Sequence, residues 1–348
     1  MSRFISVISL ALMICIFPSA EESSSGGEKA YVIEIHGEID RAMMVFIRRG
    51  IGQSKTGGAA ALIFDIDTFG GRVDSALQIT SLIGSVDSMP TIAFVPATPE
   101  GTGVSWSAGA LISFSCSRIY MAPGTSMGAA APVYQTQEGM DMAPEKVVSA
   151  LRTQMAALAE KNGYPKGIAL AMVDKDVELW EAYLGGNLLI LTPQEFELEE
   201  KKAASEGKKL QKGKPIILAG KLLTLTAGEM LTYGVSSGTV PDLAILLADL
   251  GLAHAEPVYL HQNVPDRIVT VLTSSAVTSL LVIIGLIALF MEVTSPGFGI
   301  PGTTAIVCFS ILFVSHFLLG TVGSLELIIF LCGVVLLILE IFIIPGFG

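Results

Sequence analysis

The chain divides into two regions by the pattern of its apolar and polar positions. Between residues 30 and about 170, short runs rich in β-branched and aromatic residues alternate with longer runs of helical periodicity. The expected strands are Tyr31–Ile35, Ala61–Asp65, Thr91–Val95 and Arg118–Met121, and the expected helices are Ile39–Gly50, Val73–Ser85, Ser107–Ser117 and Ala143–Lys161. Strands that alternate with helices at this spacing are typical of parallel sheets. We therefore predict an α/β domain over residues 30–255.

The C-terminal region, residues 270–348, contains three long apolar stretches. They cover residues 276–293, 303–319 and 325–344, and each has the roughly 17–25 residues needed to cross a ~30 Å hydrocarbon core. We predict that all three are transmembrane helices. The first and third stretches each contain a glutamate, Glu292 and Glu340, shortly before a Pro-Gly-Phe-Gly sequence. Such a glutamate either closes a helix end or turn, or forms a contact between helices or copies of the chain.

The N-terminus resembles a secretory signal. Arg3 precedes an apolar run from Phe4 to Phe17, which is followed by small residues and a polar stretch. Residues 1–20 are therefore predicted to be a signal peptide or an N-terminal anchor. In either case the α/β domain faces the extracytoplasmic side of a multi-pass membrane protein, and the 296–302 loop faces the inner side.

A charged segment separates the two ends of the α/β domain. Within residues 195–214, the four glutamates Glu195, Glu197, Glu199 and Glu200 are followed by six lysines, which favours a mobile or helical excursion on the surface. Order is expected to return at Pro215–Ala219 and at Leu223–Met230, where a strand leads into a helix capped by Thr226.

Composition narrows the classes of partner. Of the 348 residues 51% are hydrophobic and only 15% are charged, which is too apolar for an ordinary soluble protein and indicates contact with a lipid bilayer. The net charge of −11 argues against nucleic acid as a partner, because phosphate binding requires clustered Lys and Arg. The four cysteines and four histidines are scattered without the spacing of metal ligands. We expect no metal and no cofactor.

The candidate chemistry lies at Ser107 and at the Gly70-Gly71 pair. Ser107 is placed at the start of an apolar helix, where backbone N–H groups are free and the helix dipole is positive. The N–H of Ala108 and that of Gly70 or Gly71 are candidate donors to an oxyanion. Taken singly, such a serine is usually a helix cap and such a glycine pair a turn. Together, on an α/β core, they indicate an acyl-transfer site.

A serine nucleophile requires a base to accept its proton. No histidine lies between His36 and His254, and we interpret His36 as a structural residue. Lys146 follows Pro144 in the first turn of a predicted helix, where the helix dipole disfavours a cation and so favours the neutral amine of a base. An ordinary surface lysine is the alternative interpretation.

Residues 30–348 resemble the NfeD family of membrane-bound serine proteases, whose catalytic domain has the ClpP/crotonase-like α/β fold. The resemblance rests on stretches spread over the whole chain: Asp67-Thr68-Phe69-Gly70-Gly71, Ser107-Ala108-Gly109, Met121–Ala129, Ala143-Pro144-Glu145-Lys146, Leu223–Ala227 with Tyr233-Gly234, and Glu292 with Pro296–Gly302. A ClpP/crotonase-like protease domain followed by an α-helical transmembrane region is what this resemblance implies.

The resemblance also implies roles for particular residues. It makes Ser107 and Lys146 a Ser–Lys dyad and takes the oxyanion donors from Ala108 and from Gly71 or Gly70. It further implies a homodimer or higher homo-oligomer, and a stomatin-like membrane protein as the substrate or partner, cut in a hydrophobic segment.

Two residues depart from the family pattern. Phe69 stands where a proline is usual before the glycine pair, and Trp106 replaces a small residue before the nucleophile. Both are candidate walls of the substrate cleft. They also leave open a non-catalytic membrane scaffold that organises a stomatin-like partner. A crotonase-type acyl-CoA enzyme is a third, weaker alternative, because an exported domain would not meet acyl-CoA.

Overall fold

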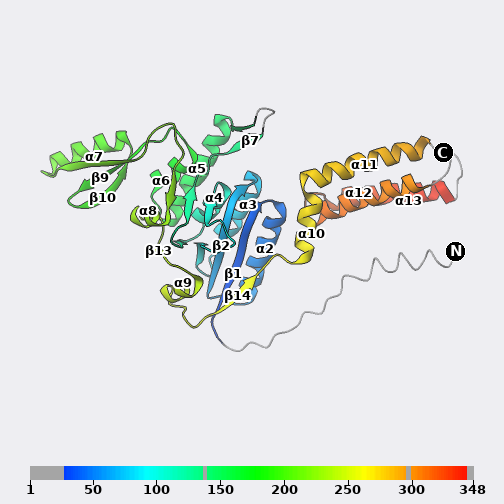
Figure 1. Cartoon of the computed structure of the whole chain (residues 1–348), viewed down its shortest axis with the longest axis horizontal. Helices are drawn as coiled ribbons and strands as arrows, with labels where there is room; N and C mark the ends of the chain where they lie inside the picture. Colours follow the sequence, from blue (N-terminus) through cyan, green and yellow to red (C-terminus); the bar gives the residue numbers. More distant parts are fainter. Residues whose placement is uncertain (1–26, 136–138, 295–298, 343–348) are drawn as a thin grey trace.

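Strand β2 (Ala61–Gly71) lies at the centre of the α/β domain in the computed structural model, which describes residues 27–135, 139–294 and 299–342 (Figure 1). The first half of β2 belongs to a parallel sheet, in the order β14 (Glu256–Leu260), β1 (Lys29–Ile39), β2, β3 (Thr91–Val95), β5 (Arg118–Met121) and β13 (Gly238–Thr239). The far end of β2 instead pairs with β4 (Val104–Trp106), which continues through β6 (Ser126–Gly128) to the antiparallel β12 (Thr224–Thr226). The end of β2 thus leads to a second branch of the sheet.

Successive side chains along the buried strands point to opposite faces of the sheet, so the core has two layers, one on each face. Ile33, Leu62 and Phe64 lie in the larger layer, which is covered by five helices: α2 (Arg41–Thr56), α3 (Val73–Gly84), α4 (Ala108–Ser115), α5 (Glu145–Asn162) and α6 (Lys166–Val173). Their neighbours Val32 and Ile63 lie in the smaller layer, which is covered by α9 (Leu243–Asp249). Adjacent strand residues point to opposite faces, so both faces of the sheet are buried.

The predicted helices occur, with most of their boundaries shifted by one to six residues; α2, for example, ends at Thr56 rather than at Gly50. The helix expected from Ile39 begins at Arg41, because Ile39 is a buried residue of β1 and the Asp40 side chain caps the helix by accepting from Met43 N at 2.7 Å. The helix expected from Ser107 begins at Ala108, with Ser107 at the N-cap position. The Thr226 cap is confirmed: Thr226 and Glu229 form a capping box at the start of α8 (Ala227–Thr232).

The charged segment is more ordered than a mobile excursion. It contributes α7 (Pro193–Ser205), an exposed helix, and the first half of β11 (Leu210–Ile217), which pairs with β9 (Leu179–Leu184) beside β10 (Asn187–Leu191). The expectation of a helix is correct for its first part, whereas residues 210–214 form a strand. Burial of Leu210 and the position of Lys212 Nζ, 3.7 Å above the Trp180 ring, explain the strand. Within the ordered stretch expected at Pro215–Ala219, residues 215–217 form the end of β11, and the strand expected before the Thr226-capped helix is β12.

The C-terminal helices extend from one side of the α/β domain (Figure 1). They are α10 (Val264–Thr273), α11 (Ser275–Thr294), α12 (Ile300–Leu318) and α13 (Ser324–Phe342). By length and composition, α11 and α12 are long and apolar enough to cross a membrane. In α13 the stretch Ser324–Leu336 is apolar but too short for this test, so the third span stays a prediction. Residues 1–20 and the second Pro-Gly-Phe-Gly sequence lie outside the described residues.

Helices α11 and α12 form an antiparallel hairpin. A Cβ added at Gly285 would lie 3.1 Å from the Phe309 ring, so the absence of a side chain at Gly285 allows the two helices to approach closely. At the other end of α11, the Glu292 carboxylate accepts hydrogen bonds from Gly299 N at 2.8 Å and Gly302 N at 2.7 Å. Of the two interpretations of Glu292, the structure supports the one in which it closes a helix end.

Candidate active site

Ser107 lies between β4 and α4 in a backbone conformation that few residues adopt. Its φ is 53° and its ψ is −117°, and among the described residues only Ala129 shares a positive φ without being glycine. Although Ser107 occupies the N-cap position, its side chain makes no capping hydrogen bond. Its backbone N–H donates to Gly128 O at 2.9 Å, so the β4–β6 pairing holds this strained turn. Strain of this kind costs roughly 1–3 kcal/mol and is concentrated at functional sites.

The glycine pair at the end of β2 packs directly against this serine. A Cβ at Gly70 would lie 2.5 Å from Ser107 Cβ and 2.8 Å from Ser107 Oγ, and Gly70 has a φ of +115°. A Cβ at Gly71 would lie 2.4 Å from Ile39 O. An added side chain would overlap its neighbours, so glycine is required at both positions. The turn predicted from the sequence did not include this steric reason.

The three candidate oxyanion donors differ in their surroundings. Ala108 is the first residue of α4, where backbone N–H groups have no partner within the helix. Gly70 N–H donates to Thr68 Oγ1 at 3.0 Å and is therefore engaged. Gly71 lines a pocket together with Ser107 and Ala108. The hydrogen bond to Ile39 O comes from the N–H of the next residue, Arg72. Ala108 and Gly71 thus border the pocket beside Ser107, and their assignment as oxyanion donors stays a prediction.

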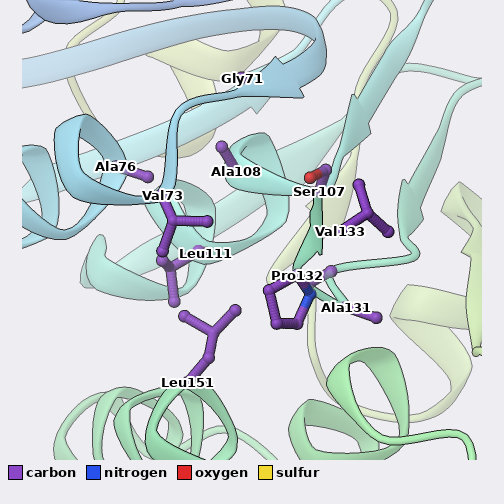
Figure 2. A pocket seen from close by; sticks show the side chains of 11 residues that line it. Gly71, Val73, Ala76, Ser107, Ala108, Leu111, Ala131, Pro132, Val133 and Leu151 are labelled. Atoms are coloured by element: carbon purple, nitrogen blue, oxygen red, sulfur yellow. The ribbon is translucent and has the colours of Figure 1, made fainter. Parts of the chain in front are cut away.

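A pocket of about 40 Å³ opens beside Ser107 (Figure 2). Its other lining residues are small or apolar: Gly71, Val73, Ala76, Ala108, Leu111, Ala130, Ala131, Pro132, Val133 and Leu151. They come from the end of β2, from α3, α4 and α5, and from the segment that enters β7 (Val133–Gln135), which pairs with β8 (Met140–Met142). Among the described residues no charged side chain lines this pocket, so it suits an apolar side chain.

Phe69 and Trp106 lie together but away from this pocket. Their rings are in edge-to-face contact with centroids 5.5 Å apart, and Trp106 Nε1 donates to Ser126 Oγ at 3.0 Å. Phe69 is 62% exposed, and neither residue is among the lining residues. Their assignment to a substrate cleft therefore stays a prediction, and it would concern a surface outside the pocket.

Lys146 lies in the first turn of α5, as expected, but it does not contact Ser107. Its side chain is exposed and forms no hydrogen bond or ion pair within the described residues. Helix α5 itself borders the site, because Leu151 lines the pocket with Ser107 (Figure 2). In this conformation the structure brings Ser107, Gly71 and Ala108 together and leaves Lys146 apart.

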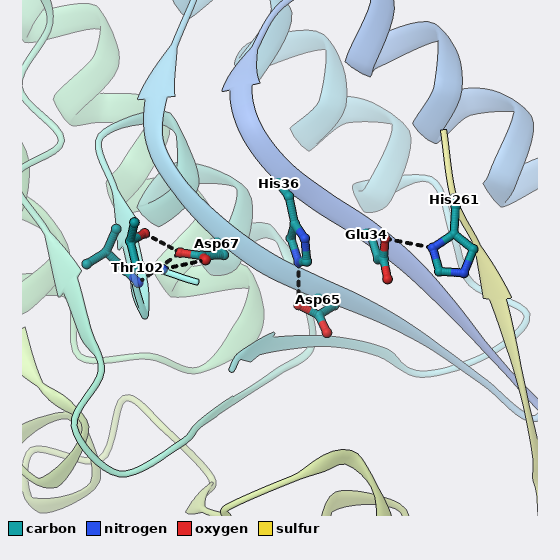
Figure 3. A network of polar contacts seen from close by, with 7 residues as sticks. Glu34, His36, Asp65, Asp67, Thr102 and His261 are labelled. Atoms are coloured by element: carbon teal, nitrogen blue, oxygen red, sulfur yellow. Dashed lines mark hydrogen bonds and ion pairs between the residues drawn. The ribbon is translucent and has the colours of Figure 1, made fainter. Parts of the chain in front are cut away.

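A network of polar contacts supports the strands that lead to the site (Figure 3). The Asp67 carboxylate on β2 accepts from Thr102 N at 2.8 Å, from the Thr102 hydroxyl, and from Val104 N at 3.3 Å. It thereby fixes the loop that enters β4, three residues before Ser107. Asp67 belongs to the motif at residues 67–71. Its role is not visible in the motif, because its hydrogen-bond partners come from a separate loop.

The two histidines of this network each face a carboxylate. His36 Nε2 lies 2.9 Å from Asp65 Oδ1, and His261 Nδ1 lies 2.7 Å from Glu34 Oε2 (Figure 3). The hydrogen bond with Asp65, followed by the nearby negative charges, outweighs burial and raises the pKa of His36 above its ordinary value. The interpretation of His36 as a structural residue agrees with this pairing.

Comparison with known proteins gives two family matches along the chain. Residues 29–209 match the model of the NfeD1b N-terminal domain, and residues 276–348 match that of the NfeD integral membrane domain. Membrane protein NfeD1b of Bacillus subtilis is 31% identical over 92% of this chain and 63% of its own length. Membrane-bound protease PH1510 of Pyrococcus horikoshii is 27% identical over 86% of this chain and 61% of its own length. The chain thus spans just over three fifths of these relatives.

Solved structures agree with this assignment at the level of the fold. The 1510-N membrane-bound stomatin-specific protease, solved in complex with a substrate peptide, matches 71% of this chain and 99% of its own with a TM-score of 0.53 and 24% identity. A second structure of 1510-N matches 68% of this chain and 99% of its own with a TM-score of 0.51 and 24% identity. The predicted α/β fold, which these structures share, and the C-terminal apolar helices that follow it are confirmed. The chain belongs to the NfeD family.

Proposed function

We propose that this protein is a membrane-bound serine endopeptidase in which Ser107 is the nucleophile and Lys146 the general base. The main support is the backbone of Ser107, whose positive φ keeps its hydroxyl free of capping bonds at the mouth of an apolar pocket. A relative whose sequence matches most of this chain is named a membrane-bound protease. A strained serine next to free backbone donors is the arrangement that acyl transfer requires.

The proposed reaction proceeds in two steps at Ser107. Neutral Lys146 Nζ accepts the hydroxyl proton while Oγ attacks the scissile carbonyl, and the N–H groups of Ala108 and Gly71 stabilise the oxyanion. Protonated Lys146 then gives its proton to the leaving amine, which releases one product and leaves an ester on Ser107. Water, deprotonated by the same lysine, hydrolyses the ester. Each oxyanion donor is expected to contribute ~3 kcal/mol to transition-state stabilisation.

This mechanism requires Lys146 to approach Ser107. Leu151, five residues further along α5, already lines the pocket, and the rise of ~1.5 Å per residue places Lys146 about 7 Å along the helix axis from it. Catalytic hydrogen bonds are often long in a free enzyme and form only with substrate bound. We therefore propose that the Ser107–Lys146 contact forms when a substrate occupies the pocket.

The proposed substrate is an apolar segment of a membrane protein, and we propose a stomatin-like protein. The pocket next to Ser107 is lined without charge, which suits an apolar side chain before the scissile bond. The structurally similar 1510-N is titled a stomatin-specific protease. A domain joined to membrane helices also lies close to segments that emerge from the bilayer.

The alternative function is a non-catalytic scaffold, and the exposed, unpaired Lys146 favours it. Incubating the purified chain with apolar and charged peptides, beside Ser107→Ala, separates the two. Cleavage of apolar peptides that disappears in Ser107→Ala supports the protease. Absence of cleavage, with undiminished binding of a stomatin-like protein by both forms, supports the scaffold.

We also propose that the α/β domain is extracytoplasmic, that the chain crosses the membrane three times, and that it forms a homodimer or higher oligomer. The α11–α12 hairpin supports this topology, since α11 ends and α12 begins on the side opposite α10, where we propose the inner face of the membrane. Exposed Thr303 offers a test: an impermeant thiol reagent should not modify Thr303→Cys in intact cells. Ready modification from outside contradicts this topology.

A further inference from the structure

Helix α10 connects the α/β domain to the membrane helices and has no buried residue. Its start is fixed by a capping box, in which Asp266 N donates to Asn263 Oδ1 and Asn263 N donates to Asp266 Oδ2, both at 3.0 Å. It ends at Thr273, and α11 begins at Ser275. The orientation of this ten-residue helix is thus fixed at its start by the capping box, and its end leads directly into α11.

The two faces of α10 differ in chemistry. On one face, Asp266 forms a two-pronged ion pair with Arg49 of α2, with distances of 2.9 Å and 2.6 Å. On another face, Val264, Ile268 and Val271 are 69%, 52% and 59% exposed. Their spacing of four and three residues places these three side chains in one row, which we call the α10 stripe. The α10 stripe has no partner within the described residues.

The position of α10 indicates what covers this stripe. Figure 1 shows α10 running across the direction of α11 and α12, at the end of these helices that faces the α/β domain. When α11 and α12 cross a bilayer, a helix in this position lies in the plane of the membrane surface. The exposed apolar residues of α11, such as Leu280 and Ile283, begin only a few residues after the α10 stripe.

We propose that α10 is an in-plane interfacial helix and that the α10 stripe inserts between lipid headgroups on the side of the α/β domain. A helix with one apolar face and polar flanks is the form that lies at such a boundary. Exposed Arg267, the last Lys or Arg of the chain, lies on α10 beside the stripe and can extend to the headgroups. The Arg49–Asp266 pair then holds the α/β domain at the bilayer surface.

Fluorescence depth measurements test this placement without altering a buried residue. Ile268→Cys and Val271→Cys are labelled with an environment-sensitive dye in the full chain. The background carries Cys15→Ala and Cys332→Ala, because Cys15 lies outside the described residues and Cys332 is exposed, whereas Cys116 and Cys308 are buried. The protein is placed in phosphatidylcholine vesicles whose acyl chains carry bromine near the headgroup or near the bilayer centre. Lys55→Cys on α2 and Leu286→Cys on α11, both exposed, serve as the water and lipid controls.

The expected result is a blue-shifted emission at residues 268 and 271 that shallow bromine quenches more than deep bromine, whereas deep bromine quenches residue 286 more. Emission at 268 and 271 like that at residue 55 would place the stripe in water and overturn the inference. Blue-shifted emission that neither bromolipid quenches would mean that protein covers the stripe, which also overturns it. These outcomes do not depend on peptidase activity.

Discussion

Gly70 and Ser107 are in such close contact that a single added methyl group at Gly70 would overlap the serine side chain, with Cβ 2.5 Å from Cβ and 2.8 Å from Oγ. The end of β2 therefore fixes the position of the nucleophile. We expect Gly70→Ala to displace Ser107 and to lower peptide cleavage by roughly 10²-fold or more, because displacement of a reacting group by about 1 Å has an effect of that size.

Gly124→Ala is the matched control for this substitution. Gly124 has a φ of +87°, so alanine there carries a similar backbone strain, but nothing lies within 4 Å of the added Cβ. Both variants should lose some stability, and only Gly70→Ala should lose most of its activity. Equal activity of the two folded variants would contradict the role of Gly70.

The size of the pocket should determine which apolar residue precedes the scissile bond. Leu151→Ala removes one wall of the pocket and should shift the preference of the enzyme towards larger apolar side chains such as phenylalanine. Leu158→Ala, on the same helix and similarly buried, removes a core contact away from the pocket. Each should cost ~2–5 kcal/mol of stability. A peptide library that shows the same selectivity for both variants would contradict the assignment of the pocket.

The His36–Asp65 pair should make stability depend on pH. Because the folded state raises the pKa of His36 above 6.5, its contribution is fully present below about pH 6.5 and is lost as the pH rises through the folded value. The pair is partly exposed, so His36→Gln should cost less than about 1 kcal/mol at low pH and progressively less above it. Thermal unfolding at several pH values measures this difference, with the exposed His254→Gln as the control. A cost that grows with pH would have the wrong sign.

Glu292 should stabilise the membrane hairpin through its two hydrogen bonds to the start of α12. Glu292→Ala leaves the N–H groups of Gly299 and Gly302 without these acceptors, at a cost of ~1–3 kcal/mol each where they are shielded from water. Glu292→Gln keeps one acceptor oxygen and should lose less. Thermal unfolding in detergent ranks the three forms, and a glutamine variant less stable than the alanine variant would contradict this role.

Features set by residues close together in the chain were predicted from the sequence, whereas features set by contacts between distant segments were not. Strand β3 and the start of α5 follow from local apolar periodicity and from Pro144, and both were predicted closely. The conformation of Ser107 was not predictable, because its positive φ depends on pairing of β4 with β6, which is distant in the chain. The same holds for the engagement of Gly70 N–H by Thr68 and for the contact between Asp67 and Thr102. Motifs gave the candidate residues of the site, and only three-dimensional packing showed that Gly70 and Gly71 differ in their surroundings.

The most direct test of Ser107 and Lys146 as one catalytic unit is a double-mutant cycle on the cleavage of an apolar fluorogenic peptide. The values of kcat/KM are measured for the wild type, Ser107→Ala, Lys146→Ala and the double variant, after each is shown to fold. We predict that each single variant loses roughly 10³-fold or more and that the double variant loses no more than the worse single one, because residues that act together are strongly non-additive. Full activity in Lys146→Ala, or losses that multiply in the double variant, would contradict the dyad.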